Sequence, residues 1–209
     1  TRNSAIRYIV IHDTGNKSKG ADADSHFRYF NGGNRNSSAD FFVDDKTVLQ
    51  VNDYTKYYTW HVGDGKGKYG ITNQNSVGIE ICVNADGNYD TAYLKAAELT
   101  KYLMKQLGID ASHVVRHYDA SRKNCPASMS ANNWALWEKF KRLIKEEIKM
   151  AECKFTDISG HYGEKQIREV FEMGIMNGVD ETHFEPDKPV TRAQAAIIAR
   201  NVVRYITGK

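Results

Sequence analysis

The sequence is poor in the features that build disulfide scaffolds, membrane spans and disordered segments. Three cysteines occur in 209 residues, an odd number at irregular spacing, which argues against a disulfide framework and favours a metal-binding or free-thiol role. No apolar run approaches the roughly 18 residues that a membrane helix needs, so we expect no membrane span. Only three prolines, with 41% apolar residues, exclude wholesale disorder.

The sequence also has little excess of one sign of charge over the other. The net charge of +3 at pH 7 suits contact with an anionic surface but is too small to indicate nucleic acid, so no nucleic-acid partner is expected. The opening residues Thr1-Arg2-Asn3 do not resemble a secretory signal. We therefore expect no signal peptide in this chain, because a leader has been trimmed or because export uses another route.

Short apolar runs alternate with helical patterns through the first 150 residues. Strands are predicted over residues 6–11, 41–43, 47–51, 77–83 and 114–115. Helices are predicted over residues 22–30, 90–107 and 132–150. This alternation predicts an α/β (α+β) fold, in which one central mixed β-sheet is flanked by helices.

The pattern changes after residue 150. Phe155-Thr156-Asp157-Ile158 begins a new segment with helical patterns over residues 163–173 and 191–205, separated by a turn-rich stretch. We place a domain boundary at residues 150–153. The prediction is a domain over residues 1–150 and a small, mainly helical module over residues 151–209.

Two histidines and a cysteine stand where a metal could be held. His12 ends the first predicted strand, His117 follows a later short strand, and Cys125 lies eight residues further on, in a loop that Pro126 stiffens. Open sheets place ligands at strand ends, and Zn²⁺ favours nitrogen and sulfur donors. Three ligands leave the fourth position for water, as in catalytic sites, whereas a structural zinc site would need a fourth protein ligand. The alternative is ordinary core or turn residues, since a lone cysteine is usually a small buried hydrophobe.

Three blocks of sequence carry a family resemblance. Residues 10–15 (VIHDTG), 75–81 (NSVGIEI) and 116–126, which include the KNCP segment, resemble the signature blocks of type 2 N-acetylmuramoyl-L-alanine amidases. That family includes phage endolysins, bacterial autolysins and peptidoglycan recognition proteins, and the resemblance covers about residues 5–147. It implies that His12, His117 and Cys125 bind Zn²⁺. It also implies cleavage of the amide bond between N-acetylmuramic acid and L-alanine in peptidoglycan.

The resemblance implies further functional residues. Glu80 falls on the family's acidic position and is expected to act as general base, and Lys123 is expected to stabilise the oxyanion. A solvated loop lysine is the alternative for Lys123. Trp60 and His61 resemble the family's substrate-cleft segment, so we expect them to contact glycan or peptide, with a plain surface histidine as the alternative. Many relatives have a second histidine where this chain has Asp13, which could orient a ligand or cap the turn.

The C-terminal segment resembles one S-layer homology module, a module that holds secreted proteins on secondary cell-wall polysaccharide. The blocks that carry the resemblance are FTDI at 155–158, GIMNG at 174–178 and VTRAQ at 190–194. It implies that Asp157, Tyr162 and Arg192 contact the acidic sugar, although Tyr162 replaces a common Trp and Gln194 a common Glu. Arg192 could instead pair with a neighbouring carboxylate. Such modules usually act in threes, so one copy suggests weak binding or self-association.

The sequence thus predicts a zinc-dependent peptidoglycan amidase that acts outside the cell at the bacterial wall, either as a phage endolysin or as a trimmed secreted protein. The main alternative is a non-catalytic peptidoglycan receptor on the same fold. Recognition proteins that have lost activity typically lack the cysteine ligand, and Cys125 is present here. That difference favours the enzyme.

Overall fold

The computed structural model describes residues 1–33, 35–145 and 153–207. The chain divides into two compact units, Thr1–Lys145 and Glu146–Lys209. The boundary expected at residues 150–153 falls mostly outside the described residues, so the division into domains at that point stays a prediction.

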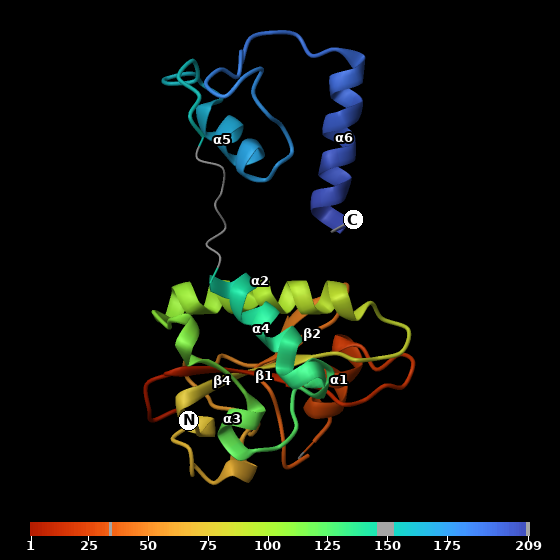
Figure 1. The fold of residues 1–209 in the computed structure, drawn as a ribbon, viewed down its shortest axis with the longest axis vertical. Helices are drawn as coiled ribbons and strands as arrows, with labels where there is room; N and C mark the ends of the chain where they lie inside the picture. The colour runs from red at the N-terminus through yellow and green to blue at the C-terminus, as the bar shows by residue number, and fades with distance from the viewer. Residues whose placement is uncertain (34, 146–152, 208–209) are drawn as a thin grey trace. The chain divides into compact units, whose positions relative to one another are not determined.

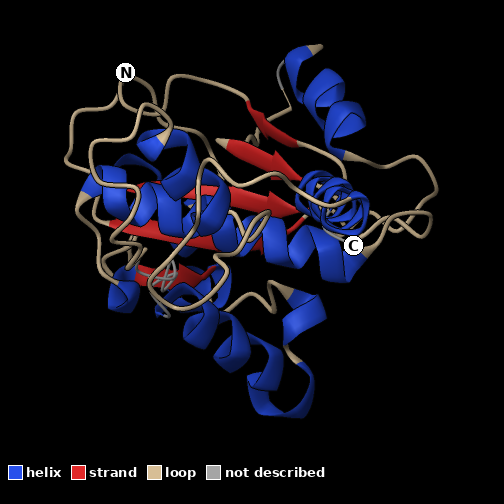
Figure 2. Ribbon diagram, turned by 90° about the horizontal axis from the view of Figure 1, so that it is seen from above, coloured by secondary structure: helices blue, strands red, loops and turns tan. Residues whose placement is uncertain are grey.

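One five-stranded sheet forms the centre of the first unit (Figures 1 and 2). Its strand order is β3-β2-β4-β1-β5. The strands are β1 (Tyr8–Asp13), β2 (Phe41–Val43), β3 (Val48–Gln50), β4 (Ser76–Ile81) and β5 (Val114–Arg116). Only β3 runs antiparallel to its neighbour, so the sheet is mixed, as the sequence predicts.

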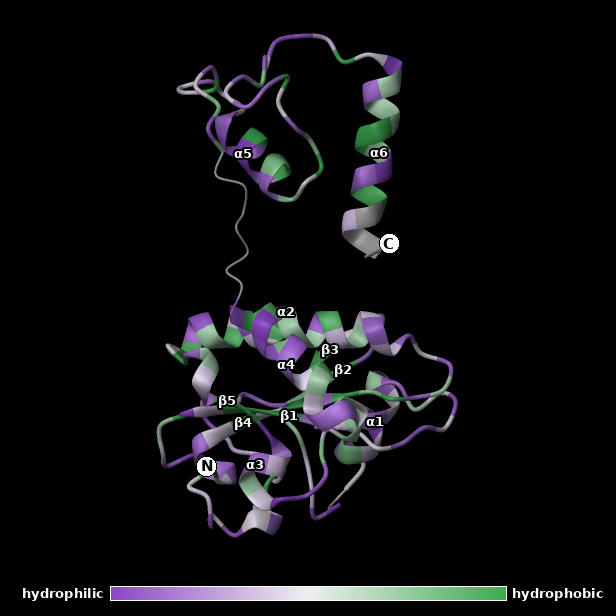
Figure 3. Ribbon diagram, in the orientation of Figure 1, coloured by the Kyte–Doolittle hydropathy of each residue, from purple (hydrophilic) through white to green (hydrophobic). Residues whose placement is uncertain are grey.

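Helices cover both faces of this sheet. Helix α2 (Tyr89–Leu107) and helix α4 (Ala131–Lys145) pack on one face, and their buried side chains join those of Ile9, Ile79 and Phe41 in the main core. Helix α1 (Ala23–Asn31) and the short helix α3 (His117–Ser121) lie on the other face (Figure 1). Helix α2 alternates hydrophobic and hydrophilic residues around its circumference, as expected for a helix with one face on a core (Figure 3).

Side chains with local hydrogen bonds fix the ends of these helices. Asp22 accepts a hydrogen bond from the backbone of Ser25 at the start of α1, and Asn88 accepts one from Thr91 at the start of α2. Gly108 ends α2 in the left-handed conformation (φ 64°), which glycine adopts without strain. The helices expected at residues 22–30 and 90–107 are confirmed within two residues.

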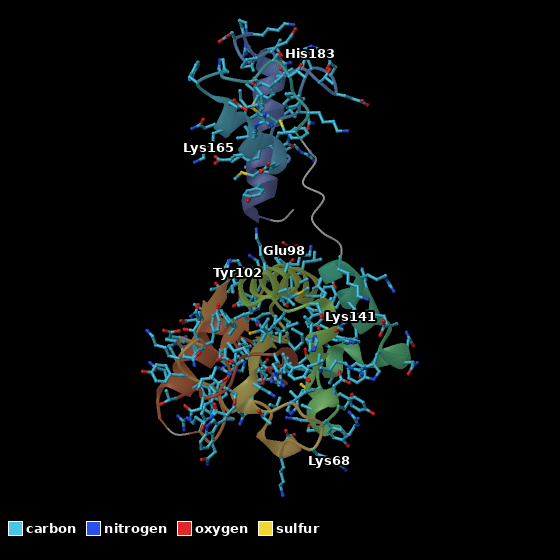
Figure 4. The ribbon with its side chains drawn as sticks, turned by 90° about the vertical axis from the view of Figure 1, so that its left-hand side faces the viewer. Lys68, Glu98, Tyr102, Lys141, Lys165 and His183 are labelled. Atoms are coloured by element: carbon cyan, nitrogen blue, oxygen red, sulfur yellow. The ribbon has the colours of Figure 1, made fainter. Side chains whose placement is uncertain are left out.

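A lysine of helix α4 forms hydrogen bonds with the edge strand β5 and the turn before it. The ammonium group of Lys141, labelled in Figure 4, donates to the backbone carbonyl of Val114 at 2.6 Å and to that of Ala111. These contacts join α4 to β5 and to the 3₁₀ helix η3 (Ala111–His113). The start of the segment that delivers His117 is thereby held in place.

The second unit has a small core of its own. Phe155, Ile158 and Ile167 are buried, and Phe171 and Phe184 pack against them. Its helices are α5 (Glu164–Glu172) and α6 (Arg192–Thr207), close to the two that the sequence predicts. Gly178 is required in this unit because a Cβ there would overlap the ring of Phe155. None of the described helices in either unit is long and apolar enough to cross a membrane.

Candidate metal centre and catalytic site

Strand alternation places the candidate residues on the sheet face opposite α2 and α4. Successive residues of a strand point to opposite faces, so Ile9 and Ile11 enter the main core while His12 points to the other side. On the neighbouring parallel strand, Ser76, Gly78 and Glu80 share that other face. The register pairs His12 of β1 with Glu80 of β4, which brings these two side chains together.

His117 reaches the same place from helix α3, which begins at this residue. The carboxylate of Asp119 accepts hydrogen bonds from the backbone N–H of Arg116 (2.9 Å) and from its guanidinium group (2.7 and 3.0 Å). This pairing closes the first turn of α3 directly after β5 ends. The sequence does not predict α3, because five residues are too few to show a helical pattern.

Cys125 is held in place by the end of β1. The carboxylate of Asp13 accepts hydrogen bonds from the backbone N–H (2.7 Å) and the hydroxyl group (2.9 Å) of Ser128, in the 3₁₀ helix η4 (Ala127–Met129). The backbone N–H of Tyr118 donates to the carbonyl of Cys125 at 3.0 Å. The loop that carries the thiol is therefore tied to β1 and to α3, the two elements that carry the histidines.

The three side chains converge as the sequence predicts. The Nδ1 atoms of His12 and His117 lie 3.0 Å apart, and Sγ of Cys125 lies 3.9 Å from Nδ1 of His12. The three donor atoms lie within 4.8 Å of one another, and all three residues are buried. Among the described residues, no other group of histidine, cysteine and acidic side chains meets this condition.

The chemistry of this donor set fits a zinc ion. Nε2 of His117 lies 2.8 Å from Oδ1 of Asp64, a carboxylate that can only accept, so the proton is on Nε2 and the Nδ1 lone pair points at His12. Metal-binding histidines commonly donate their second nitrogen to a carboxylate in this way. Two imidazoles and one thiol are a catalytic type of zinc ligand set, with one position open.

Burial favours the neutral forms of these ligands. Desolvation lowers the pKa of His12 well below its ordinary value, and it lowers the pKa of His117 against the opposing effect of Asp64. Burial also raises the pKa of Cys125 to about 12. The thiol therefore carries its proton at neutral pH unless a cation binds, and binding a metal here would release that proton.

Glu80 lies beside the cluster with its side chain 19% exposed. Its Oε1 lies 3.8 Å from Nδ1 of His12, and its Oε2 has no hydrogen-bond partner among the described residues. Burial and, less strongly, the charge of Asp13 raise the pKa of Glu80 to about 8, while the ammonium group of Lys123 lowers it. Lys123 also lowers the pKa of His12, His117 and Cys125, so its charge acts on the whole centre.

Cavities open on two sides of the centre. One, of about 460 Å³, is lined by Glu80 and by residues of α1 and the loop before it, including His26 and Phe30. The other, of about 450 Å³, is lined by Lys123, Cys125 and residues at the end of β1. Both include Thr14 in their walls, and one reaches Glu80 while the other reaches Cys125.

The remaining predicted site residues lie in different surroundings. Trp60 is 52% exposed, whereas His61 is buried with its ring against His12. In the second unit, both carboxylate oxygens of Asp157 accept backbone hydrogen bonds from Phe184, and Oδ2 accepts another from Glu185. Tyr162 is 92% exposed beside His161, and Arg192 is exposed. Their expected contacts with substrate or polysaccharide stay predictions.

Two residues at the centre escaped the sequence analysis. Asp64 lies in the 3₁₀ helix η1 (Gly63–Gly65), and Ser76 is the first residue of β4. Neither has a spacing or periodicity that marks a metal site. The loop over residues 54–75 brings Asp64 to His117, and the pairing of β4 with β1 places Ser76 on the sheet face of His12. The sequence signal that was present is the unusual length of that loop.

Comparison with known proteins agrees with this fold. Residues 2–128 match the N-acetylmuramoyl-L-alanine amidase family, and residues 154–196 match the S-layer homology domain. The chain therefore belongs to the N-acetylmuramoyl-L-alanine amidase family and carries a C-terminal S-layer homology module. The mixed sheet and the family expected from the sequence are both confirmed.

Individual relatives match the first unit. The N-acetylmuramoyl-L-alanine amidases CwlH and XlyA of Bacillus subtilis (strain 168) are 40% and 39% identical over 60% and 64% of this chain. The chain spans less than half of their lengths, 49% and 42%. The structure of the catalytic domain of XlyA matches with a TM-score of 0.60 and 38% identity, over 67% of this chain and 86% of that one. The structure of PlyL matches with a TM-score of 0.58 and 29% identity, over 66% and 83%.

Proposed function

We propose that this chain is a zinc-dependent amidase that hydrolyses the bond between N-acetylmuramic acid and L-alanine in bacterial peptidoglycan. The observation that carries the proposal is the convergence of His12, His117 and Cys125 beside the carboxyl group of Glu80, whose Oε2 is buried without a partner among the described residues. Membership of the amidase family, and the names of CwlH and XlyA, support the choice of bond.

The residues of the centre divide the reaction between them. A zinc ion held by the three ligands would lower the pKa of a water molecule toward 7 and polarise the substrate carbonyl. Glu80 takes the proton of the attacking water and passes it to the leaving amine. Its burial keeps the pKa of the carboxyl group near neutrality, where a group can both accept and return a proton. Lys123 supplies a positive charge for the oxyanion, since its ammonium group acts on the centre electrostatically.

We propose that the C-terminal module attaches the enzyme to secondary polysaccharide of the cell wall, where the whole protein acts. The match to the S-layer homology domain supports this role. The exposed side chains of Tyr162 and Arg192 are available for contact with a polymer. Asp157 contributes by ordering the backbone over residues 184–185, through the hydrogen bonds that its carboxylate accepts.

Loss of one ligand tests the metal site. Cys125→Ser is expected to lower bound zinc from about one ion per chain to a small fraction of that, and to abolish wall lysis with it. Zinc is measured by elemental analysis of the purified protein. Cys153→Ser is the matched control, because its thiol lies in the other unit. Lysis that persists in a metal-free Cys125→Ser protein would contradict the assignment.

Products of digestion test the bond. Peptidoglycan treated with the wild-type chain is expected to release stem peptides with a new N-terminal alanine and to gain no new reducing sugar ends, as read by mass spectrometry. Binding to peptidoglycan without release of any stem peptide would instead identify a receptor on this fold.

A further inference from the structure

We propose that His61 and Ser76 form a hydrogen-bond relay that fixes which ring nitrogen of His12 faces the metal position. The inference rests on the proposed zinc site and deepens it. His61 is thereby a positioning residue that acts through His12, in place of the substrate contact expected from the sequence. The relay begins at a backbone carbonyl group and ends at a metal ligand.

The fixed end of the relay is the carbonyl oxygen of Thr72. A carbonyl can only accept, and Oγ of Ser76 lies 2.6 Å from it, so the single hydroxyl proton of Ser76 is directed to Thr72. Nε2 of His61 lies 3.1 Å from the same Oγ. Because the serine has already used its proton, Oγ can only accept here. His61 must therefore carry a proton on Nε2.

The next step follows from burial. His61 is 8% exposed and His12 is 1% exposed, and burial of this kind disfavours a charged imidazole. With its one proton on Nε2, His61 presents a lone pair at Nδ1, which lies 3.0 Å from Nε2 of His12. His12 must donate across that contact. Its remaining lone pair is then on Nδ1, the atom that lies 3.0 Å from Nδ1 of His117.

Two separate acceptors therefore hold the ring proton on Nε2 in both histidine ligands. The carboxylate of Asp64 holds the proton of His117 on Nε2, and the relay from Thr72 holds the proton of His12 on Nε2. Both Nδ1 lone pairs point at the same small volume, where they repel one another unless a cation lies between them. The centre is thus arranged for a cation before one binds, and part of the orientation comes from residues that do not touch it.

The backbone around His61 is shaped to allow this contact. A Cβ on Gly78 would lie 2.8 Å from Cγ and Nδ1 of His61, so only glycine at this place in β4 lets the ring approach the strand this closely. Oδ1 of Asn73 accepts hydrogen bonds from the backbone of His61 (3.1 Å) and Val62 (2.9 Å). These contacts hold the ring between Ser76 and His12.

The relay is tested by the zinc affinity of three variants. The affinity is measured by competition with a chelating indicator. His61→Leu removes the acceptor for His12 and is expected to weaken zinc binding roughly 10- to 100-fold. His61→Gln offers one acceptor and one donor at similar spacing, and is expected to recover most of that loss. Ser76→Ala is a milder change, for use if His61→Leu does not fold, and is expected to weaken binding several-fold, on the order of 10-fold at most.

The control removes a comparable hydroxyl group elsewhere. Thr100 is fully buried in α2, and its hydroxyl donates to the carbonyl of Ala96 at 2.7 Å. Thr100→Val should lower stability but leave zinc affinity unchanged. If His61→Leu, or Ser76→Ala in its place, binds zinc as tightly as the wild type, the relay is overturned.

A spectroscopic measurement separates this inference from the proposed function. The ¹⁵N chemical shifts of the His61 ring in the metal-free wild-type protein report which nitrogen carries the proton. A proton on Nε2 supports the relay, whereas a proton on Nδ1 overturns it. This reading does not depend on zinc. If the wild-type chain does not bind zinc, the proposed metal site is wrong. The position of the proton on the His61 ring would still show whether the relay exists.

Discussion

Asp40 offers a sharp test of the electrostatics beneath the site. It directly precedes β2 and is fully buried, and its Oδ2 accepts hydrogen bonds from the backbone N–H of Gly78 and the hydroxyl of Thr59, both at 2.8 Å. Its Oδ1 is buried without a partner among the described residues. Burial raises the pKa of Asp40 from 3.8 to about 6. The substitution Asp40→Asn replaces the carboxyl group by a neutral group of the same shape.

The raised pKa fixes the sign and size of the effect. Between pH 3.8 and about 6 the folded protein keeps a proton that the unfolded chain has lost, so the free energy of unfolding falls as pH rises through this window. The full difference corresponds to roughly 3 kcal/mol at 1.36 kcal/mol per pKa unit. Asn cannot ionise, and its amide can donate to Oδ1 of Asn52, which is buried beside it without a partner among the described residues. Asp40→Asn should therefore equal the wild type near pH 4 and exceed its stability by roughly 3 kcal/mol above pH 7.

The assay is urea denaturation followed by tryptophan fluorescence from pH 4 to pH 8. All three tryptophans, Trp60, Trp134 and Trp137, lie in the first unit, so the signal reports that unit alone. Asp110→Asn is a control of opposite sign, because hydrogen bonds from Ser112 and His113 hold the pKa of Asp110 well below its usual range. This variant should be less stable than the wild type by a nearly constant amount from pH 5 to pH 8, because the pH window set by the lowered pKa lies at and below 3.8. A stability difference for Asp40→Asn that stays flat across the series would refute the reasoning.

Three further outcomes are expected. Glu80→Gln should retain zinc but lose about 10²- to 10⁴-fold in turnover of soluble muropeptide, and near-normal turnover would show that the base lies elsewhere. Phe140→Ala, at a fully buried position of α4, should lower the free energy of unfolding by about 3–5 kcal/mol in urea titrations, and a loss under about 1 kcal/mol would contradict the packing described. A chain ending at Lys145 should still cleave soluble muropeptide but sediment less with cell walls, and undiminished sedimentation would remove the anchoring role.

Much of the fold can be predicted because its main elements have strong local patterns. The run at residues 6–11 has the β-branched composition of a buried strand, and it forms most of β1 (Tyr8–Asp13). Gly108 ends α2 in the left-handed conformation, as expected from the sequence, whereas the N-cap is Asn88, two residues before the expected start at Asp90. His12 lies near the carboxyl end of β1, where the neighbouring strands also end, and the predicted ligands therefore converge there.

The parts that could not be predicted depend on contacts between distant segments. The environment of His61 is set by the register of β1 on β4 and by the absence of a side chain at Gly78, and neither is visible in the sequence around position 61. The role of Asp64 depends likewise on a contact with His117, 53 positions further along the chain. For Asp157 the sequence suggests a sugar contact, but hydrogen bonds to residues 184–185 appear only when the module is folded.

The three donors of the centre are spread over 113 positions of the chain, from His12 to Cys125. During synthesis the ribosome adds Cys125 more than a hundred codons after His12, and after all the residues of β4 (Ser76–Ile81). A polypeptide that ends before residue 125 therefore lacks the thiol and cannot complete the three-donor cluster.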